Sequence, residues 1–457
     1  MKACTLLLLL FLLTSVCSVR AADPGLAEPD ALINRLLASN PQLRGLEAEW
    51  KSARQQAVIA GALPDPMFVF GHYVSSVETR VGPMQEKIGL SQKFPWFGKL
   101  STARKVAAKE AAAQELIWRA AGEELSFQLA SAYIDAAYSR DSVGLLDTQV
   151  VLTGEIRKAA ERIYGSTNAK AAGQEDVLRF SVLADRFRDR QIVLRENEKL
   201  AIDRIERMLN GPLPKGARFS LEIATNARRP VPTTAERSFA YAYDVRPELL
   251  ASQLQLDAAQ LRERLARLDY YPDVTIGADY TVVGEANQTT MMQPGAAGMP
   301  PTSVTGRASD SGKDSAMVFF SINVPIWWDK QAAQVEQAKE KSRAQESRIQ
   351  DLQAAIKREI LEAYRNAQAA EESVRLHREK LIPQATRARE LSLADYSSGK
   401  QNFLNVLDAE NSVLELQLKL LDTEAKAARA KWKLYRALGV ASCTPARETT
   451  KSVRNSK

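Results

Sequence analysis

The chain has 457 residues, with 62 lysines and arginines against 55 aspartates and glutamates, which gives a formal net charge of +7. The acids and bases are interleaved along the sequence, and this pattern argues against a nucleic-acid-binding protein. Two histidines occur without a phosphate-binding glycine loop, a metal-spaced His/Cys cluster or a nucleophile motif, so neither an enzyme nor a cofactor is predicted.

The first 21 residues have the features of a secretory signal peptide. Lys2 gives a positive start, leucines form the apolar centre, and small residues near Ala21 provide a cleavage site. The residues before Cys17 fit lipid attachment poorly, so we favour cleavage over lipidation. Cys443 then remains alone; we interpret it as a bystander rather than a reactive thiol. No later apolar run approaches about 20 residues, so no transmembrane helix is predicted.

The chain after the signal is a tandem duplication. Asn40-Pro41-Gln42-Leu43 recurs as Arg246-Pro247-Glu248-Leu249, and Phe94-Pro95 recurs as Val324-Pro325. The copies are offset by 206 residues at the first motif and by 230 at the second, so about 24 extra residues lie in the second copy. The sequence therefore divides into a signal peptide (1–21), a first repeat (22–210), an irregular proline-rich linker (211–240), a second repeat (241–440) and a tail (441–457).

Each repeat is predicted to contain a helix, a strand hairpin and a long helical hairpin. The strand hairpins are placed at 67–94 and 273–324, and the helical hairpins at 99–209 and 330–438. The segment 284–315 is rich in glycine, proline and methionine, and it is expected to be a loop without packed structure.

The helical hairpins are predicted to be long coiled coils. Lys99–Tyr164 contains no proline and Lys330–Tyr396 contains only Pro383, so each is predicted to be one helix of roughly 100 Å. Apolar residues recur every seven positions from Val406 to Leu434, which predicts a left-handed supercoil. His377 lies among charged residues and is expected to be solvated.

The predicted strands alternate between apolar and polar residues, as in a sheet with one polar face. The positions predicted to face lipid are Ile276, Val318, Phe320 and Ile322. Aromatic residues gather where strands meet helices, and we interpret them as a girdle at the membrane surface: Trp96, Phe97, Tyr270, Tyr271, Trp327 and Trp328. His72 falls on the outward phase of the first strand, which the alternation does not explain.

Four amphipathic strands per chain cannot close a membrane barrel, and lipid does not tolerate open sheet edges. Two chains would give a barrel filled by its own side chains, whereas three would give twelve strands around an open interior. We therefore predict a mixed α and β membrane protein. Its expected fold is a trimeric 12-stranded membrane β-barrel, continued by a long α-helical coiled-coil barrel.

In the order and spacing of its motifs, the chain resembles the TolC family of outer-membrane efflux channels over roughly residues 30 to 440. The matching runs are Arg246-Pro247-Glu248-Leu249, Phe94-Pro95-Trp96-Phe97-Gly98-Lys99, Val324-Pro325-Ile326-Trp327-Trp328, and Tyr396-Ser397-Ser398-Gly399 followed by Val406-Leu407-Asp408-Ala409. The resemblance implies a homotrimer, with an outer-membrane β-barrel in contact with lipid and a periplasmic α-helical coiled-coil barrel. It would serve as the exit duct of an efflux system, with a periplasmic adaptor and an inner-membrane transporter as partners.

The resemblance leaves the transported substrate open. Leu63-Pro64-Asp65-Pro66-Met67 is similar to members that work with heavy-metal exporters, while drug efflux and protein secretion remain alternatives. A periplasmic adaptor also uses long helical hairpins, but it needs one set rather than two. Met291, Met292 and Met299 are weak candidates for a soft-metal site; without accompanying cysteine or histidine, we predict no metal there.

By the same resemblance, side chains at the periplasmic turns hold the duct closed and bind cations. Tyr396 and Asp176 correspond to latch positions, and Asp408 corresponds to one position of an acidic ring. Gln401 stands where family members have an arginine, and Asn405 where they have a second aspartate. A weaker latch and weaker cation block are expected, because hydrogen bonds to charged groups are the stronger ones.

Overall fold

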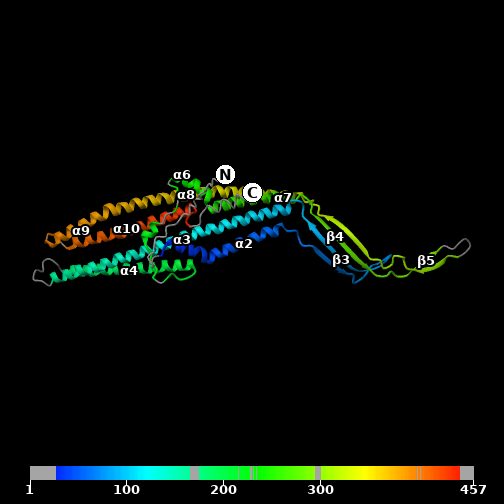
Figure 1. The fold of residues 1–457 in the computed structure, drawn as a ribbon, viewed down its shortest axis with the longest axis horizontal. Coiled ribbons are helices and arrows are strands. Elements are labelled where there is room, and N and C mark those ends of the chain that lie inside the picture. Colours follow the sequence, from blue (N-terminus) through cyan, green and yellow to red (C-terminus); the bar gives the residue numbers. More distant parts are fainter. Residues whose placement is uncertain are drawn as a thin grey trace, which may run out of the picture. The chain divides into compact units, whose positions relative to one another are not determined.

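The computed structural model describes residues 27–164, 174–214, 216–226, 229, 231–232, 234–293, 300–398, 400–401 and 403–442. The predicted signal peptide with Cys17, and Cys443 in the tail, lie outside these residues. The chain divides into two compact units, whose elements are labelled in Figure 1. We call residues 45–119 and 247–354 the strand unit, and residues 1–44, 120–246 and 355–457 the helix unit.

One antiparallel sheet lies in the strand unit, with its main strands in the order β1–β3–β4–β7. The strands are β1 (Met67–His72), β3 (Gly82–Phe94), β4 (Val274–Val283) and β7 (Ser315–Ile322), and a short β2 (Glu78–Thr79) pairs with β3. β3 of the first repeat pairs with β4 of the second from Phe94 opposite Val274 onward, so both repeats share one sheet (Figure 1). Among the described residues, β1 and β7 are its outermost strands.

Helices α2 (Pro41–Gly61) and α7 (Pro247–Leu268) precede the two strand hairpins, and α3 (Lys99–Tyr164) and α8 (Trp328–Leu376) follow them. Small apolar side chains permit close packing of α3 on α7, where Ala113 and Leu116 meet Ala251 and Leu254. Trp50 of α2 stacks on Trp118 of α3 with ring centroids 5.6 Å apart.

The helix unit contains the C-terminal parts of α3 and α8, from residues 120 and 355 onward. Its other helices are α1 (Pro29–Ser39), α4 (Gln174–Leu209), α5 (Leu221–Asn226), α6 (Ala235–Val245), α9 (Ile382–Ser397) and α10 (Phe403–Ala437). Its core joins α3, α4 and α10 through Val143, Leu146, Phe187, Leu194, Leu414 and Leu418. Val406 and Val413, two members of the seven-residue pattern, are 3% and 1% exposed.

In each repeat, the residue before the recurring proline (Pro41 or Pro247) is hydrogen-bonded to the end of the last long helix of that repeat, α4 or α10. In the first repeat the Asn40 amide donates to the carbonyl of Met208 at 2.8 Å, and its oxygen accepts from the backbone N–H of Gln42. In the second repeat Arg246 donates to the carbonyl of Ala437 at 3.3 Å. Arg246 is 4% exposed and also pairs with Glu359 of α8 at 2.8 Å.

Two segments expected to be irregular are not. Within 284–315, strands β5 (Thr289–Gln293) and β6 (Thr302–Gly306) form an antiparallel hairpin, with the Thr290 and Thr305 hydroxyls 3.2 Å apart. Threonine and valine favour strands there despite the flanking glycines. The linker 211–240 contains α5 and the start of α6, where Thr234 caps the helix by accepting from the N–H of Arg237.

The prediction of one uninterrupted helix over Lys330–Tyr396 was wrong. A π turn, η1 (His377–Leu381), separates α8 from α9. Proline lacks the N–H that a regular helix needs, and Pro383 lies two residues beyond this turn. The expectation that His377 is solvated was also wrong: it is 9% exposed, because η1 packs against α10.

Candidate functional site

The register of the sheet places the four predicted lipid-facing residues on one face. Ile276 lies opposite Phe320, Val274 opposite Ile322 and Ala278 opposite Val318. Side chains on paired positions share a face, so these residues line up with Ile88 and Leu90 of β3 and Phe68 and Phe70 of β1. Val318 is 81% exposed and Phe320 65%, so the chain by itself leaves a broad apolar surface open. That this surface faces lipid stays a prediction.

The opposite face of the sheet is largely polar in its central strands. Lys87 of β3 and Asp279 of β4 form an ion pair at 2.7 Å. Gly277 is buried under Phe319, and a Cβ at Gly277 would overlap that ring. Glycine is required here because the aromatic ring of β7 lies against the backbone of β4.

The six predicted girdle residues lie at the end of the sheet where strands meet helices. The rings of Trp96 and Tyr271 stack at 5.2 Å, Phe97 meets Trp96 edge-on at 5.9 Å, and Tyr270 lies 6.2 Å from Trp328. Phe97 is 87% exposed and Trp327 is 70% exposed. Amphipathic rings grouped at one level suit a membrane surface, and their role as a girdle stays a prediction.

Sequence reasoning missed the residue that organises this corner. Asp273, just before β4, accepts from the Trp96 backbone N–H at 3.0 Å and from Lys99 at 2.9 Å, and it pairs with Lys93 at 3.0 Å. Burial alone would raise the pKa of Asp273, but these donors outweigh it and lower the pKa to about 2. The motif Phe94–Lys99 was noticed, but its acidic partner lies 174 residues from Lys99 in the sequence.

The far end of the sheet is tied together across the repeats. Arg80 pairs with Asp310, the Gly312 N–H donates to the Val81 carbonyl at 2.7 Å, and the Gly284 N–H donates to the Pro83 carbonyl at 2.8 Å. The segment 284–315 is therefore joined to the β1–β3 hairpin. We call these contacts the outer brace.

His72 lies at this same end, opposite Glu86, with its Nδ1 3.9 Å from the Glu86 carboxylate. His72 therefore lies on the outward face of the sheet, but in a polar border beyond the apolar residues of that face. Of the methionines, Met292 in β5 is 76% exposed. Met299 and the side chain of Met291 lie outside the described part of the chain.

The predicted gate residues belong to the helix unit. Tyr396 is half-buried at the second-last position of α9, and Gln401 is exposed in the turn that follows. Asn405 and Asp408 are exposed on the first turns of α10. Asp176 is in α4, but its side chain lies outside the described part. The α9–α10 hairpin thus carries Tyr396, Asn405 and Asp408, while their action as a latch is untested.

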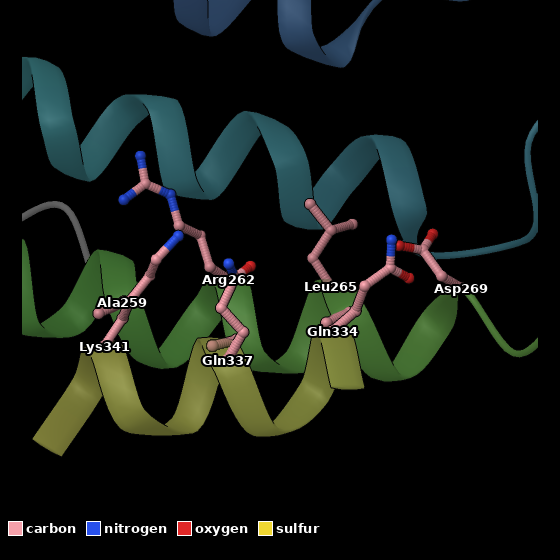
Figure 2. A pocket seen from close by; sticks show the side chains of 9 residues that line it. Ala259, Arg262, Leu265, Asp269, Gln334, Gln337 and Lys341 are labelled. Carbon is pink, nitrogen blue, oxygen red and sulfur yellow. The ribbon is translucent and has the colours of Figure 1, made fainter. Parts of the chain in front are cut away.

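A groove of about 250 Å³ separates α7 from α8 in the strand unit (Figure 2). Arg262 of α7 and Asp269, which directly follows α7, line it together with Gln334, Gln337 and Lys341 of α8. Arg262 also pairs with Glu110 of α3. Within the described ranges, no three His, Cys, Asp or Glu side chains are grouped to hold a metal ion. Across those same ranges, no helix combines the length and apolar character needed to cross a bilayer.

An amphipathic sheet combined with long helical hairpins is the arrangement that the sequence predicts for a membrane channel. Residues 242–440 match the family model described as "Outer membrane efflux protein". The outer membrane efflux protein BepC of Brucella suis is 23% identical over 357 residues, which are 77% of this chain and 72% of BepC. The chain is thus similar to the outer membrane efflux protein family, in agreement with the TolC-like resemblance of its motifs.

Solved structures show the same fold. The MtrE outer membrane channel of Neisseria gonorrhoeae matches with a TM-score of 0.72 and 19% identity, over 90% of this chain and 89% of MtrE. The crystal structure of CusC, a protein that forms a transmembrane channel, matches with a TM-score of 0.71 and 15% identity, over 90% of this chain and 92% of CusC. The predicted mixed α and β fold, with an antiparallel sheet and long helical hairpins, is therefore confirmed, and the trimer stays a prediction.

Proposed function

We propose that three copies of the chain form the outer-membrane exit duct of a tripartite efflux system. The observation that carries the proposal is the four-stranded sheet with one continuous apolar face and with β1 and β7 as its outermost strands. Pairing of β7 with β1 of the next copy would leave neither strand with an open edge. A sheet in lipid must have no open edge, because unpaired backbone groups cannot be hydrated there. The ring would then contain no unpaired strand and would enclose the Lys87–Asp279 face.

In this assembly the inner face is polar and the helices extend the passage into the periplasm. A periplasmic adaptor and an inner-membrane transporter are the proposed partners, since a passive duct has no energy source of its own. We propose transport without catalysis by this chain. Which substrate passes is a property of the pump to which the duct is attached.

The test compares two arginine substitutions on adjacent residues of β4. Ile276 is 48% exposed on the apolar face, whereas Thr275 lies on the opposite face, opposite Ser321. A charge at the bilayer midplane of a barrel costs about 2–4 kcal/mol, and a trimer repeats it three times. Ile276→Arg should therefore abolish the heat-modifiable trimer in outer-membrane fractions. Thr275→Arg should keep the trimer and change its conductance in planar bilayers.

Equal trimer yields for the two variants would refute the orientation of the sheet. A wild-type chain that fractionates with soluble periplasmic proteins would refute the exit-duct proposal as a whole. Co-purification of an adaptor and an inner-membrane transporter with the tagged wild-type chain, but not with Ile276→Arg, would identify the partners.

A further inference from the structure

The helices next to the sheet form a layer in which α7 lies between α3 and α8 (Figure 2). A second groove, of about 520 Å³, adjoins the first, since Ala259, Arg262 and Lys341 line both. It is lined from the α3 side by Glu110 and from the α8 side by Arg348. Because side chains from both neighbouring helices reach over α7, the two grooves lie on the concave side of the layer. We call them together the α7–α8 groove.

Positive charge prevails in the α7–α8 groove. Arg262 and Lys341 extend from α7 and α8 into the same part of it (Figure 2), and Arg262 pairs with Glu110. Lys341 and Arg348 are exposed, and neither has an acidic partner among the described residues. They are seven residues apart, which places them on one face of α8 about 10 Å from each other along the helix axis. The groove therefore offers two uncompensated cations to a ligand.

A chain of ion pairs connects the groove to the polar face of the sheet. Lys93 lies on that face, opposite Thr275, and pairs with Asp273 at 3.0 Å. Asp273 accepts from Lys99 at 2.9 Å. The Lys99 amine also lies 3.5 Å from Asp269, the second acid that lines the groove. The groove and the polar face therefore lie on the same side of the strand unit, and Asp269, like Glu110, already has a cationic partner.

We propose that the α7–α8 groove faces the lumen of the assembled duct and binds organic anions in transit. The inference rests on the proposed duct, in which the polar face of the sheet lines the passage. A layer of helices that closes into a tube turns its concave side inward, which places the groove on the same inner wall. Two uncompensated cations from each of three chains then surround the passage and raise the local concentration of anions.

The walls of the groove define the ligand further. Its larger part has the volume of a small-molecule site. Between the cations the walls are formed by small apolar side chains, which are Ala258, Ala259, Ala338 and Ala344. A ligand with an apolar body and a carboxylate, sulfonate or phosphate group fits both features. Among the substrates that the sequence leaves open, this favours organic anions over metal cations, which the same charges repel.

Thiol reaction rates in detergent-solubilised trimers test the charge of the groove. In a Cys443→Ser background, Gln337→Cys places a thiol on the groove wall without removing a charge. The ratio of its reaction rates with an anionic and a cationic methanethiosulfonate reports the local potential. Lys341→Gln combined with Arg348→Gln should lower this ratio about fivefold at low ionic strength, where screening is weak.

A double substitution on another face of α8 is the matched control. Lys339→Gln combined with Arg343→Gln removes the same charge from the same helix, but these residues do not line the groove and pair with Glu336 and Glu340 of α8. The control should change the ratio much less. An equal fall in both double variants, or in neither, would overturn the cationic groove.

Two naphthalene compounds of opposite charge test the ligand class. A naphthalenesulfonate should slow the reaction of Gln337→Cys with neutral methyl methanethiosulfonate severalfold, whereas naphthylmethylammonium should not. The protection should disappear when Lys341→Gln and Arg348→Gln are added, because the ring alone then has no charged partner. Equal protection by the two compounds, or protection by neither, would overturn the assignment to organic anions.

Planar bilayers test whether the groove faces the lumen. Anionic methanethiosulfonate should change the conductance of Gln337→Cys channels in discrete steps. It should leave Gln350→Cys channels unchanged, because Gln350 is exposed on α8 but does not line the groove. Steps in both variants, or in neither, would overturn the lumenal position. If wild-type trimers carry no current, the duct proposal fails, while the reaction rates in detergent still decide whether the groove attracts anions.

Discussion

The substitution Asp273→Asn tests whether the Asp273 carboxylate stabilises the corner where the strands meet the helices. The Asp273 side chain is 12% exposed and holds Lys93, Lys99 and the N–H of Trp96. Its pKa falls from 3.8 to about 2 in the folded chain. At about 1.4 kcal/mol per pKa unit, the carboxylate contributes roughly 2 kcal/mol. Asp273→Asn should therefore destabilise each chain by about 2 kcal/mol at pH 7.

The pH dependence has a defined sign. Because the folded pKa is depressed, the stabilisation is fully present above the unfolded pKa of 3.8 and is lost as the pH falls through about 2. The stability difference between wild type and Asp273→Asn should thus be constant from pH 5 to 8 and shrink below about pH 4. Urea-induced unfolding of detergent-solubilised trimers at several pH values measures this difference.

Asp269→Asn is the matched control for that experiment. Asp269 lies 3.5 Å from the same Lys99 amine, but its side chain is 46% exposed. An exposed pair contributes at most about 1 kcal/mol, so the control should have the smaller effect. Two results would refute a stabilising role of Asp273 at this corner. One is a loss of stability for Asp269→Asn as large as that for Asp273→Asn, and the other is a stability difference between wild type and Asp273→Asn that persists unchanged to pH 2.

Three further outcomes are expected. Arg246→Leu should lower stability by about 1–3 kcal/mol in urea unfolding, because Glu359 loses one of its two arginine partners and the Ala437 carbonyl loses a donor; an unchanged stability would contradict this. Asp310→Ala should leave trimers intact but speed proteolysis of segment 284–315 in whole cells, since it breaks the ion pair with Arg80 in the outer brace; an unchanged cleavage rate would argue against the brace. Asp408→Ala should reduce block by divalent cations in bilayers, and unchanged block would leave Asp408 without a gating role.

The features that local patterns encode were accessible from the sequence. Alternation of apolar and polar residues placed Ile276 and Phe320 on one face, and their cross-strand pairing in the structure agrees with that phase. The seven-residue period likewise marked Val406 and Val413, which are buried. Each of these depends on a repeat of two or seven residues, which a single segment reveals by itself.

The features that depend on distant partners were not accessible. Asp273 matters through Lys93 and Lys99, and no local pattern connects residues so far apart in the sequence. His377 was misjudged because its burial comes from α10 rather than from its charged neighbours on the same helix. Pro383 did carry a signal, since proline inside a helical pattern predicts a break or kink at the preceding turn.

The anchoring bonds of the two repeats differ in the partners that they need. Asn40 is neutral, so its bond to Met208 needs no counter-ion, and the counterpart of Glu359 in that copy is Leu129, which is fully buried. Arginine at position 246 without an acid nearby would place an unpaired cation where only 4% of the side chain reaches solvent. Glu359 is held in place by Arg436 as well. Grafting arginine onto position 40 should therefore fail unless a glutamate replaces Leu129 in the same variant.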